Sequence, residues 1–382
     1  MPKFPFTSHA VGHIAGNVYS ALAHKLAGFS GEVYPLHVGD TWLEPAIGCR
    51  MEDLTVDRYP GMHRYAPPQG RRDLLEAVAE RTARRSGLAV TPENLLISAG
   101  ATGGLGAVAG ALLQPGDDVL VLTPYWPLIV GILRCYGARP VPVDLLTDGE
   151  AEEIRGRLDA ARTDACSAIY LSTPNNPSGR VIPAAWIEAI VDWAAEHDLW
   201  VFSDEVYEDY VYEGEHAPAR PFSPERTFSV HSFSKAFGMA GNRCGYVVGP
   251  SERMADLCKV STHAFYSTPT ASQIAAVQVL DGRGDDWLAD VRPRYRQAGK
   301  DAADQLGLAA PQGSTFLFMD VADQLDERGL IGFLEDCADE GLFLAPGPSF
   351  GPHPTHIRIC FTAARPEVVG RGVRLLARRL GR

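Results

Sequence analysis

Short apolar runs alternate with longer segments of helical periodicity through the middle of the chain. Runs typical of buried β-strands occur at residues 95–98, 119–122, 168–172, 200–203, 227–231 and 245–248. Several of the segments between them repeat apolar residues at the three- and four-residue spacing of an α-helix. Because strands and helices alternate, the pattern predicts an α/β fold in which a mostly parallel central sheet carries helices on both faces.

Two helices are clear from their sequences. One begins at Pro183 and places an apolar stripe on one face, made of Trp186, Ile187, Ile190, Val191, Ala194 and Ala195. The other is predicted over residues 72–85 and stops at Gly87, because glycine readily ends a helix. The arginines at its ends, including Arg84 and Arg85, are expected to face solvent.

The pattern changes after about residue 270. A long polar helix over residues 285–306 precedes a strand at 316–321, a helix, a second strand at 356–361 and a C-terminal helix at 366–380. This mixture predicts a smaller α+β domain. We therefore expect a large domain over residues 49–275 and a small domain over residues 276–382, with the N-terminal segment 1–48 joining the small domain.

Composition narrows the class of protein. The chain has 382 residues and a formal net charge of −12, and its lysines and arginines form no basic cluster, so no nucleic-acid partner is expected. The longest apolar stretch, residues 119–133, is too short and too proline-interrupted to span a membrane, and the first residues lack the apolar core of a signal peptide. The seven scattered cysteines are typical of reduced thiols and offer no zinc site. We expect a cytoplasmic protein with neither a membrane partner nor a bound metal.

A lysine follows the apolar run at residues 227–231, in the sequence Ser232-Phe-Ser-Lys235. Burial at the end of a strand disfavours the ammonium form and leaves a neutral, nucleophilic amine. Such an amine condenses with an aldehyde to give a Schiff base. A surface lysine in a serine-rich turn is the alternative that this motif alone leaves open.

Polar residues also follow two other predicted strands. Asn176 and Asp204 are separated by the length of one strand–helix–strand unit, so both are expected after the carboxyl ends of neighbouring strands, where open α/β sheets bind ligands. Asp204 follows an apolar run, and a buried carboxylate needs a positive partner or strong donors. Tyr207 would bring a phenol to the same place. Alternatively, Asp204 caps a turn, and Asn-Pro-Ser-Gly at Asn176 is itself a good turn sequence.

A glycine-rich segment, Gly100-Ala-Thr-Gly-Gly104, follows the first strand and opens a helix that ends near Leu113. The free N–H groups and partial positive charge at a helix N-terminus bind anions such as phosphate. A dinucleotide fingerprint fits poorly, because Gly104, Gly106 and Gly110 lie inside the helix and no acidic residue ends a strand at the required distance. The lysine of a phosphate-binding P-loop is also missing. A nicotinamide-dependent dehydrogenase is therefore disfavoured.

A phosphate at Thr102, a pyridine nitrogen at Asp204, a ring hydroxyl at Asn176 and Tyr207 and an aldehyde at Lys235 together describe pyridoxal 5′-phosphate. Over most of its length the chain resembles the fold-type-I, pyridoxal-phosphate-dependent aminotransferases of the class I/II family. The resemblance implies that Lys235, Asp204 and Tyr207 are catalytic. Cofactor contacts are implied for these three and for the other residues that match family motifs, which are Ala101, Thr102, Trp126, Asn176, Ser232, Arg243 and Tyr65.

The resemblance also implies the substrates, an amino acid and a 2-oxo acid. Arg358, in His-Ile-Arg-Ile, matches the arginine that binds the substrate α-carboxylate, and Gly39 and Asn176 match further substrate contacts. Tyr65 matches a tyrosine that reaches the phosphate site of the partner subunit, which implies a homodimer with shared active sites.

Family members that prefer dicarboxylic acids carry an arginine shortly before an aromatic-Ser-x-Pro stretch. Residues 262–269 contain no arginine, so we expect that aspartate and glutamate are not the specific substrate. His263 in this stretch either contacts a substrate from the partner subunit or is simply packed. Trp42, Asn17 and Tyr19 are further pocket candidates, for which ordinary packing is the preferred interpretation.

Other classes of function stay open at this point. Lyases, cyclases and decarboxylases of this fold share the same lysine and the same electron-accepting cofactor. A cofactor-binding regulatory module would need an appended helix-turn-helix and a basic patch, and the sequence contains neither.

Overall fold

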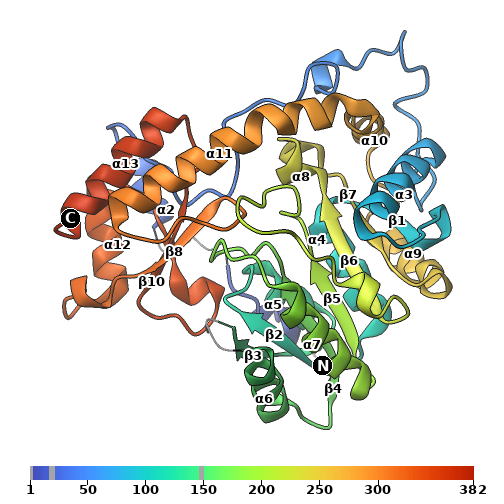
Figure 1. The fold of residues 1–382 in the computed structure, drawn as a ribbon, viewed down its shortest axis with the longest axis horizontal. Coiled ribbons are helices and arrows are strands. Elements are labelled where there is room, and N and C mark those ends of the chain that lie inside the picture. The colour runs from blue at the N-terminus through green and yellow to red at the C-terminus, as the bar shows by residue number, and fades with distance from the viewer. Residues whose placement is uncertain (1–2, 17–21, 146–149) are drawn as a thin grey trace.

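The computed structural model describes residues 3–16, 22–145 and 150–382. A seven-stranded sheet forms the centre of its larger part (Figure 1), with the strands in the order β1-β7-β6-β5-β4-β2-β3. The strands from β6 to β3 in that order are parallel, whereas β7 runs antiparallel to both β6 and β1. The strands are β1 (Leu95–Ser98), β2 (Asp118–Thr123), β3 (Arg139–Asp144), β4 (Cys166–Ser172), β5 (Trp200–Asp204), β6 (Thr227–Ser232) and β7 (Gly245–Val248).

Helices cover both faces of this sheet. On one face α4 (Gly100–Leu112), α5 (Leu128–Cys135) and α9 (Ser251–Phe265) share a hydrophobic cluster with Ala168 and Tyr170 of β4. On the other face α6 (Ala151–Ala161) and α7 (Ala184–Glu196) pack with the intervening residues Ile169 and Leu171. Because the residues of the inner strands are buried on one face or the other, these strands are mainly apolar runs. The predicted α/β architecture is confirmed.

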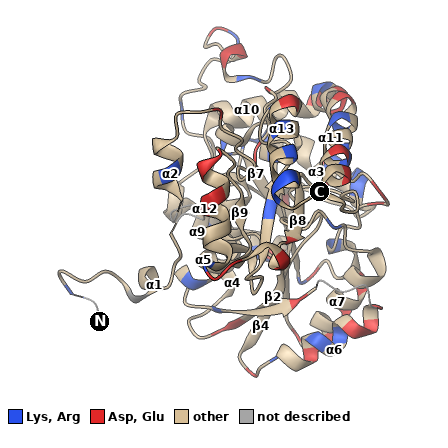
Figure 2. Cartoon of the chain, turned by 90° about the vertical axis from the view of Figure 1, so that its left-hand side faces the viewer, with Lys and Arg blue, Asp and Glu red and all other residues tan. Residues whose placement is uncertain are grey.

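The smaller part contains a three-stranded antiparallel sheet in the order β8-β10-β9, formed by β8 (Phe316–Asp320), β9 (Ala345–Pro346) and β10 (His356–Cys360). Its helices are α11 (Gly284–Leu306), α12 (Gly329–Asp339) and α13 (Pro366–Arg379). Helix α11 crosses from the small sheet to α10 (Thr270–Gln278) (Figure 1), and acidic and basic residues are interspersed along it (Figure 2). Val369, Val373 and Leu376 of α13 are buried in the core of this part.

The N-terminal segment runs along the small sheet, after the short helices α1 (His9–Gly12) and α2 (Ala23–Gly28). Tyr34 forms a bridge with Leu342, and the N–H of Cys360 donates to the carbonyl of Leu36 at 2.7 Å. These contacts join residues 34–36 to the small sheet, whereas α1 packs against α5 of the large part, so the assignment of residues 1–48 to the small domain stays a prediction. The domain boundaries at residues 48 and 275 stay a prediction.

Two strands were absent from the prediction, the two-residue β9 and the edge strand β3. β3 contains Pro140 and Pro142, and proline has no N–H to donate to a sheet. β3 lies at the edge of the sheet, where Arg139 and Leu145 donate their N–H groups to the carbonyls of Asp117 and Thr123 at 2.7 and 2.9 Å. The prolines occupy the intervening positions and face away from the neighbouring strand, which is why an edge strand tolerates them.

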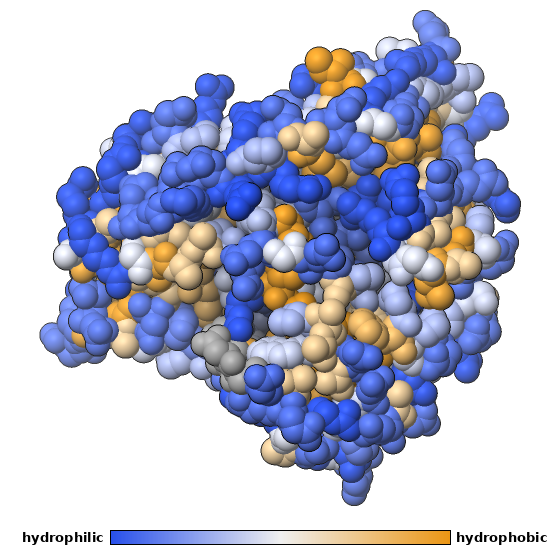
Figure 3. Space-filling model, viewed as in Figure 1, coloured by the Kyte–Doolittle hydropathy of each residue, from blue (hydrophilic) through white to orange (hydrophobic). Residues whose placement is uncertain are grey.

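The face of the molecule in Figure 3 is mainly hydrophilic, with apolar side chains in separate groups. Within the described ranges, no helix combines the length and the apolar character needed to cross a membrane.

Candidate active site

A cavity of about 570 Å³ lies where β4, β5 and β6 end, between the large sheet and the small part. This is the edge at which open α/β sheets bind ligands. The cavity brings together residues that are far apart in the sequence and that were predicted as site residues. They are Gly39, Ala101, Thr102, Trp126, Asn176, Asp204, Tyr207, Ser232, Lys235, Arg243 and Arg358.

Lys235 lies on α8 (Phe233–Ala236), a single helical turn that follows β6 directly. The Ser232 hydroxyl caps this turn by accepting the N–H of Ser234 at 3.1 Å. Lys235 Nζ donates to the carbonyl of Gly39 at 2.6 Å. Burial lowers the pKa of Lys235, and the positive charges of Arg358 and Arg243 act in the same direction. The amine is therefore more readily deprotonated than a surface lysine, as the sequence predicted.

Asp204 is the last residue of β5 and is 3% exposed. It accepts a hydrogen bond from the Tyr170 hydroxyl at 2.8 Å. Burial raises the pKa of Asp204 to about 6, so this carboxylate gains from a cationic N–H in the cavity. The Tyr207 ring packs edge-on against Phe316, with 5.6 Å between ring centroids. Burial raises the pKa of Tyr207, so it stays a neutral phenol.

One corner of the cavity is suited to a phosphate. Helix α4 starts at Gly100 (φ +68°), and a Cβ at this position would lie 2.6 Å from Arg243 Nη2. The absence of a side chain thus lets the guanidinium sit beside the helix N-terminus, where two positive potentials add. Among the described residues no carboxylate lies within ion-pair distance of Arg243. The Thr102 and Ser232 hydroxyls line the same corner.

A second positive group lies on the opposite wall. Arg358 of β10 is 6% exposed, and its guanidinium lies between the rings of Phe316 and Phe350, at 4.3 and 4.8 Å from their centroids. It donates to Asn176 Oδ1 at 3.1 Å and to the carbonyl of His37 at 2.6 Å. These contacts fix the plane of the guanidinium, which is the geometry required to bind a carboxylate. Burial, together with the charge of Arg358, lowers the pKa of His37 to about 4.

Two predicted site residues do not reach the cavity of their own chain. Tyr65 is 84% exposed and packs against Tyr266, with 4.8 Å between ring centroids. His263 is exposed near the end of α9, with Nδ1 2.8 Å from the carbonyl of Lys259. Their predicted roles depend on a partner subunit and stay predictions.

The other pocket candidates are not supported as lining residues. Trp42 packs against Tyr295, with 5.4 Å between ring centroids, at the edge of the hydrophobic core. Asn17 and Tyr19 lie outside the described residues.

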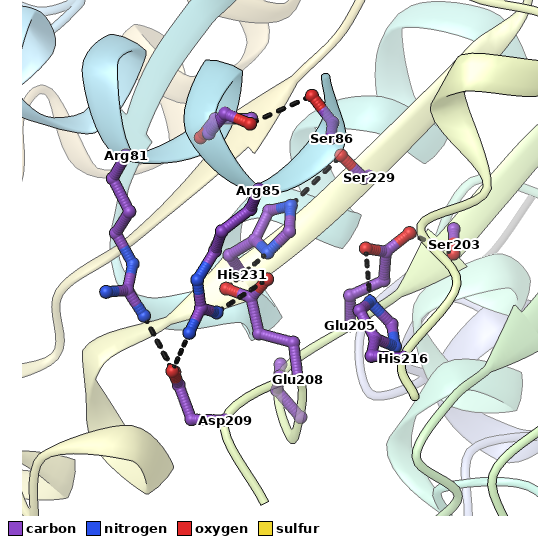
Figure 4. Close-up of polar contacts among 12 residues, drawn as sticks. Arg81, Arg85, Ser86, Ser203, Glu205, Glu208, Asp209, His216, Ser229 and His231 are labelled. Atoms are coloured by element: carbon purple, nitrogen blue, oxygen red, sulfur yellow. Dashed lines mark hydrogen bonds and ion pairs between the residues drawn. The ribbon is translucent and has the colours of Figure 1, made fainter. Parts of the chain in front are cut away.

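Sequence reasoning missed a largely buried cluster of charged residues (Figure 4). We call it the rear cluster, and it consists of Arg81, Arg85, Glu205, Glu208, Asp209, His216 and His231. Arg81 Nη2 lies 2.8 Å from Asp209, and Arg85 Nη1 lies 3.1 Å from Glu208. Arg85, in the last turn of α3 (Arg72–Ser86), is exposed to solvent as expected, and its guanidinium also pairs with carboxylates of the segment that follows β5.

The rear cluster and the active-site cavity share the same short segments. Asp204 and Tyr207 line the active-site cavity, whereas their neighbours Glu205 and Glu208 line a second cavity of about 310 Å³. In β6, Ser232 faces the active site and the preceding residue, His231, faces the rear. His231 Nδ1 lies 3.1 Å from Glu208 Oε1, so this contact joins the two segments from behind.

The rear cluster also places three possible metal ligands, Glu205, Glu208 and His231, within 4.8 Å of one another. Their polar atoms already have protein partners, since Glu205 bonds to His216 and Glu208 bonds to Arg85 and His231. The cluster is therefore balanced by its own ion pairs.

Comparisons with a family model, with related sequences and with solved structures all point to the same protein family. Residues 46–374 match the family model described as aminotransferase class I and II. The aspartate/prephenate aminotransferase of Thermus thermophilus is 33% identical over 329 residues, which cover 84% of each chain. The arginine–pyruvate transaminase of Pseudomonas aeruginosa is 34% identical over 358 residues, which cover 89% of this chain and 88% of that protein.

Solved structures agree. Thermus thermophilus aspartate aminotransferase with maleate has a TM-score of 0.90 at 29% identity, covering 98% of this chain and 100% of the other. N-succinyldiaminopimelate aminotransferase from Mycobacterium tuberculosis has a TM-score of 0.88 at 25% identity, with the same coverage of 98% and 100%.

Proposed function

This chain belongs to the class I and II aminotransferases, which move an amino group between an amino acid and a 2-oxo acid with pyridoxal 5′-phosphate, and we propose that the cavity around Lys235 carries out this transfer. The observation that carries the proposal is the position of Lys235. Its amine lines the same cavity as a buried carboxylate, Asp204, and two arginines, Arg243 and Arg358, each suited to a different anion.

The residues present fit the cofactor. The N-terminus of α4 with Thr102, Ser232 and Arg243 would hold the phosphate, and Asp204 would hold the protonated ring nitrogen. Asn176 and Tyr207 would contact the ring hydroxyl, Trp126 would lie against the ring face, and Lys235 would anchor the aldehyde. When bound there, the cofactor supplies an electron-poor ring that accepts the electrons of a broken Cα–H bond.

The other residues act on the substrate. Arg358 binds the α-carboxylate through its guanidinium. Asn176 and two aromatic rings already fix the orientation of this group, so the arginine side chain loses little conformational entropy when the substrate binds. Lys235 Nζ then removes the proton from the substrate Cα, a step that requires the neutral amine favoured by burial.

We further propose that the preferred amino acid has one carboxylate and an apolar side chain. The cations among the described lining residues are Lys235, Arg243 and Arg358, and each has a role already. His37 lines the wall as a neutral ring, because its pKa is about 4. Val38 and Leu128 are 39% and 48% exposed and line the cavity, so they offer apolar contact to a side chain.

The proposed enzyme is a cytoplasmic homodimer. All seven cysteines are unpaired, which suits a reducing compartment. The exposed ring of Tyr65 is available to a second copy of the chain, as expected for a tyrosine that completes the neighbouring phosphate site.

Two experiments test these assignments. Borohydride reduction followed by peptide mass mapping should find a pyridoxyl group on Lys235, and its absence there would refute the assignment of the lysine. A panel of amino acids, with keto-acid and ammonia measured in parallel, should give keto-acid without ammonia. Aspartate as the best donor would contradict the proposed substrate class while leaving the transfer reaction intact.

A further inference from the structure

We propose that Tyr170 is a positioning residue of this enzyme, whose hydroxyl donates a hydrogen bond to Asp204 and keeps that carboxylate ionised and oriented toward the ring nitrogen of the cofactor. The inference rests on the proposed function, because it concerns the partner of the ring nitrogen. It concerns a tyrosine in the middle of a strand that no sequence motif marks.

The geometry separates the two oxygens of Asp204. The Tyr170 hydroxyl on β4 donates to Oδ2 at 2.8 Å. The residue directly opposite Asp204 on β4 is Ser172, two positions after Tyr170, so the tyrosine side chain extends diagonally across the sheet to reach Asp204. From the residues that the structure describes, Oδ1 receives one long hydrogen bond, from the N–H of Val206 at 3.4 Å. Asp204 lines the cavity, so one oxygen is held by the protein while the carboxylate keeps capacity to accept a further donor.

The charges around Asp204 explain why one hydroxyl matters. Burial raises the pKa of this carboxyl, and the hydrogen bond from Tyr170 is the strongest opposing influence. His231 on β6 also lowers the pKa of Asp204, whereas Glu205, the next residue in the chain, raises it. Tyr170 is 0% exposed and burial raises its own pKa, so it is the donor throughout the physiological range. If Asp204 were protonated, it would be neutral and could not form an ion pair with the protonated ring nitrogen.

The ring and the hydroxyl of Tyr170 have separable roles. The ring belongs to the hydrophobic cluster beneath α4 and α5, and phenylalanine would preserve that packing. Tyr170→Phe therefore removes the hydrogen bond alone. Tyr212→Phe is a matched control, because that hydroxyl also donates a short bond, 2.6 Å to the carbonyl of Ser314, but makes no contact with Asp204.

The experiment compares the two holoenzyme variants with the parent. Loss of pyridoxal phosphate on dilution is followed by absorbance between pH 5 and 8, and kcat is measured over the same range. For Tyr170→Phe we expect roughly tenfold faster cofactor loss and an acid limb that moves up by about one pH unit, because a hydrogen bond to a charged group is lost. For Tyr212→Phe we expect both quantities to match those of the parent.

A double-mutant cycle tests whether Tyr170 acts through Asp204. In an Asp204→Asn background the additional Tyr170→Phe change should speed cofactor loss by less than about threefold, since the carboxylate it serves is gone. Full additivity would overturn the proposal. A Tyr170→Phe enzyme with the parent's cofactor retention and pH profile would also overturn the proposal. A Tyr170→Phe chain that no longer folds would overturn it as well, since the hydroxyl would then be needed for folding. A parent that bound no pyridoxal phosphate would overturn the proposed function as well, whereas failure in the variant alone would overturn only the role of Tyr170.

Discussion

Arg358 illustrates how single residues gain their function from neighbours. The aromatic rings of Phe316 and Phe350 lie with their centroids 4.3 and 4.8 Å from its guanidinium carbon, and Asn176 and the carbonyl of His37 accept hydrogen bonds from its N–H groups. The match of His-Ile-Arg-Ile to a family motif predicted its role, but nothing in the sequence identified the two rings.

Replacing Arg358 with lysine should therefore impair substrate binding despite conserving charge. An ammonium cannot stack between two rings or bind a carboxylate through two parallel hydrogen bonds. We expect kcat/KM for the amino acid to fall by roughly a hundredfold, with the absorbance of the bound cofactor unchanged. Steady-state kinetics and a spectrum of the same sample check both parts, and a loss of bound cofactor would contradict the assigned role.

His37 is a single residue that makes the stability of the folded protein depend on pH. Its folded pKa of about 4 lies below the unfolded value of 6.5, so the unfolded chain binds more protons between these limits. The contribution of His37 is present above pH 6.5 and is lost as the pH falls toward 4. A His37→Asn variant should lack this loss, which amounts to at most about 3 kcal/mol.

The raised pKa of Asp204 acts in the opposite direction over part of the same window, so the quantity to compare is the difference between variant and parent. Denaturant unfolding at several pH values measures it. Parallel pH curves for the two proteins would contradict the prediction.

At the scale of single elements, the N-terminus of α4 combines backbone and side-chain charge. Gly100→Ala should displace Arg243, because the added Cβ would lie 2.6 Å from its guanidinium, and should also strain a backbone with φ +68°. Gly87 has the same φ of +68° but no atom within 4 Å of an added Cβ. We expect both variants to lose about 1 kcal/mol of stability and only Gly100→Ala to lose affinity for the cofactor. Equal cofactor retention in the two variants would show that the glycine serves the backbone alone.

The rear cluster makes a prediction for α3. Arg81 and Asp209 are 5% and 3% exposed, so Arg81→Leu leaves a buried carboxylate without one of its partners. We expect the free energy of unfolding to fall by about 3–5 kcal/mol. Arg72 on the same helix pairs with Glu76 at the surface, and Arg72→Leu should change stability by less than about 0.5 kcal/mol. Urea titrations of the two variants provide the comparison.

Elements and site residues differed in how far the sequence predicted them. Alternation of apolar strands with helices gave the parallel sheet, because both faces of a buried strand must be apolar. The edge strand β3 was not predicted, because its prolines argue against a strand unless the segment is known to lie at the edge of the sheet. The ion pair between Arg85 and Glu208 was not predicted, because local sequence gives only the solvated position of an arginine at a helix end, and tertiary packing alone brings the opposite charge to it.

At the scale of the whole molecule, the cavity takes its walls from segments that lie more than three hundred residues apart, from Gly39 to Arg358. Family motifs located these residues individually. Their distances follow from the packing of the N-terminal segment on β10, which local periodicity does not encode.

If active sites are shared between subunits, two defective chains should rescue each other. In a hybrid dimer of Lys235→Ala and Tyr65→Ala chains, one site would keep both Lys235 and the tyrosine of the other chain. We expect a refolded mixture to exceed the activity of either variant measured alone. Activity equal to the mean of the two variants would show that Tyr65 does not act across the interface.

The alternation of cavity-facing and rear-facing residues has a consequence for how this enzyme can change. Adding one amino acid between β5 and Tyr207 would shift every following side chain by one place. Glu208 and Asp209 would then leave their cationic partners, and Val206 or the inserted residue would take the position of the phenol. The length of this stretch is therefore as constrained as the residues within it.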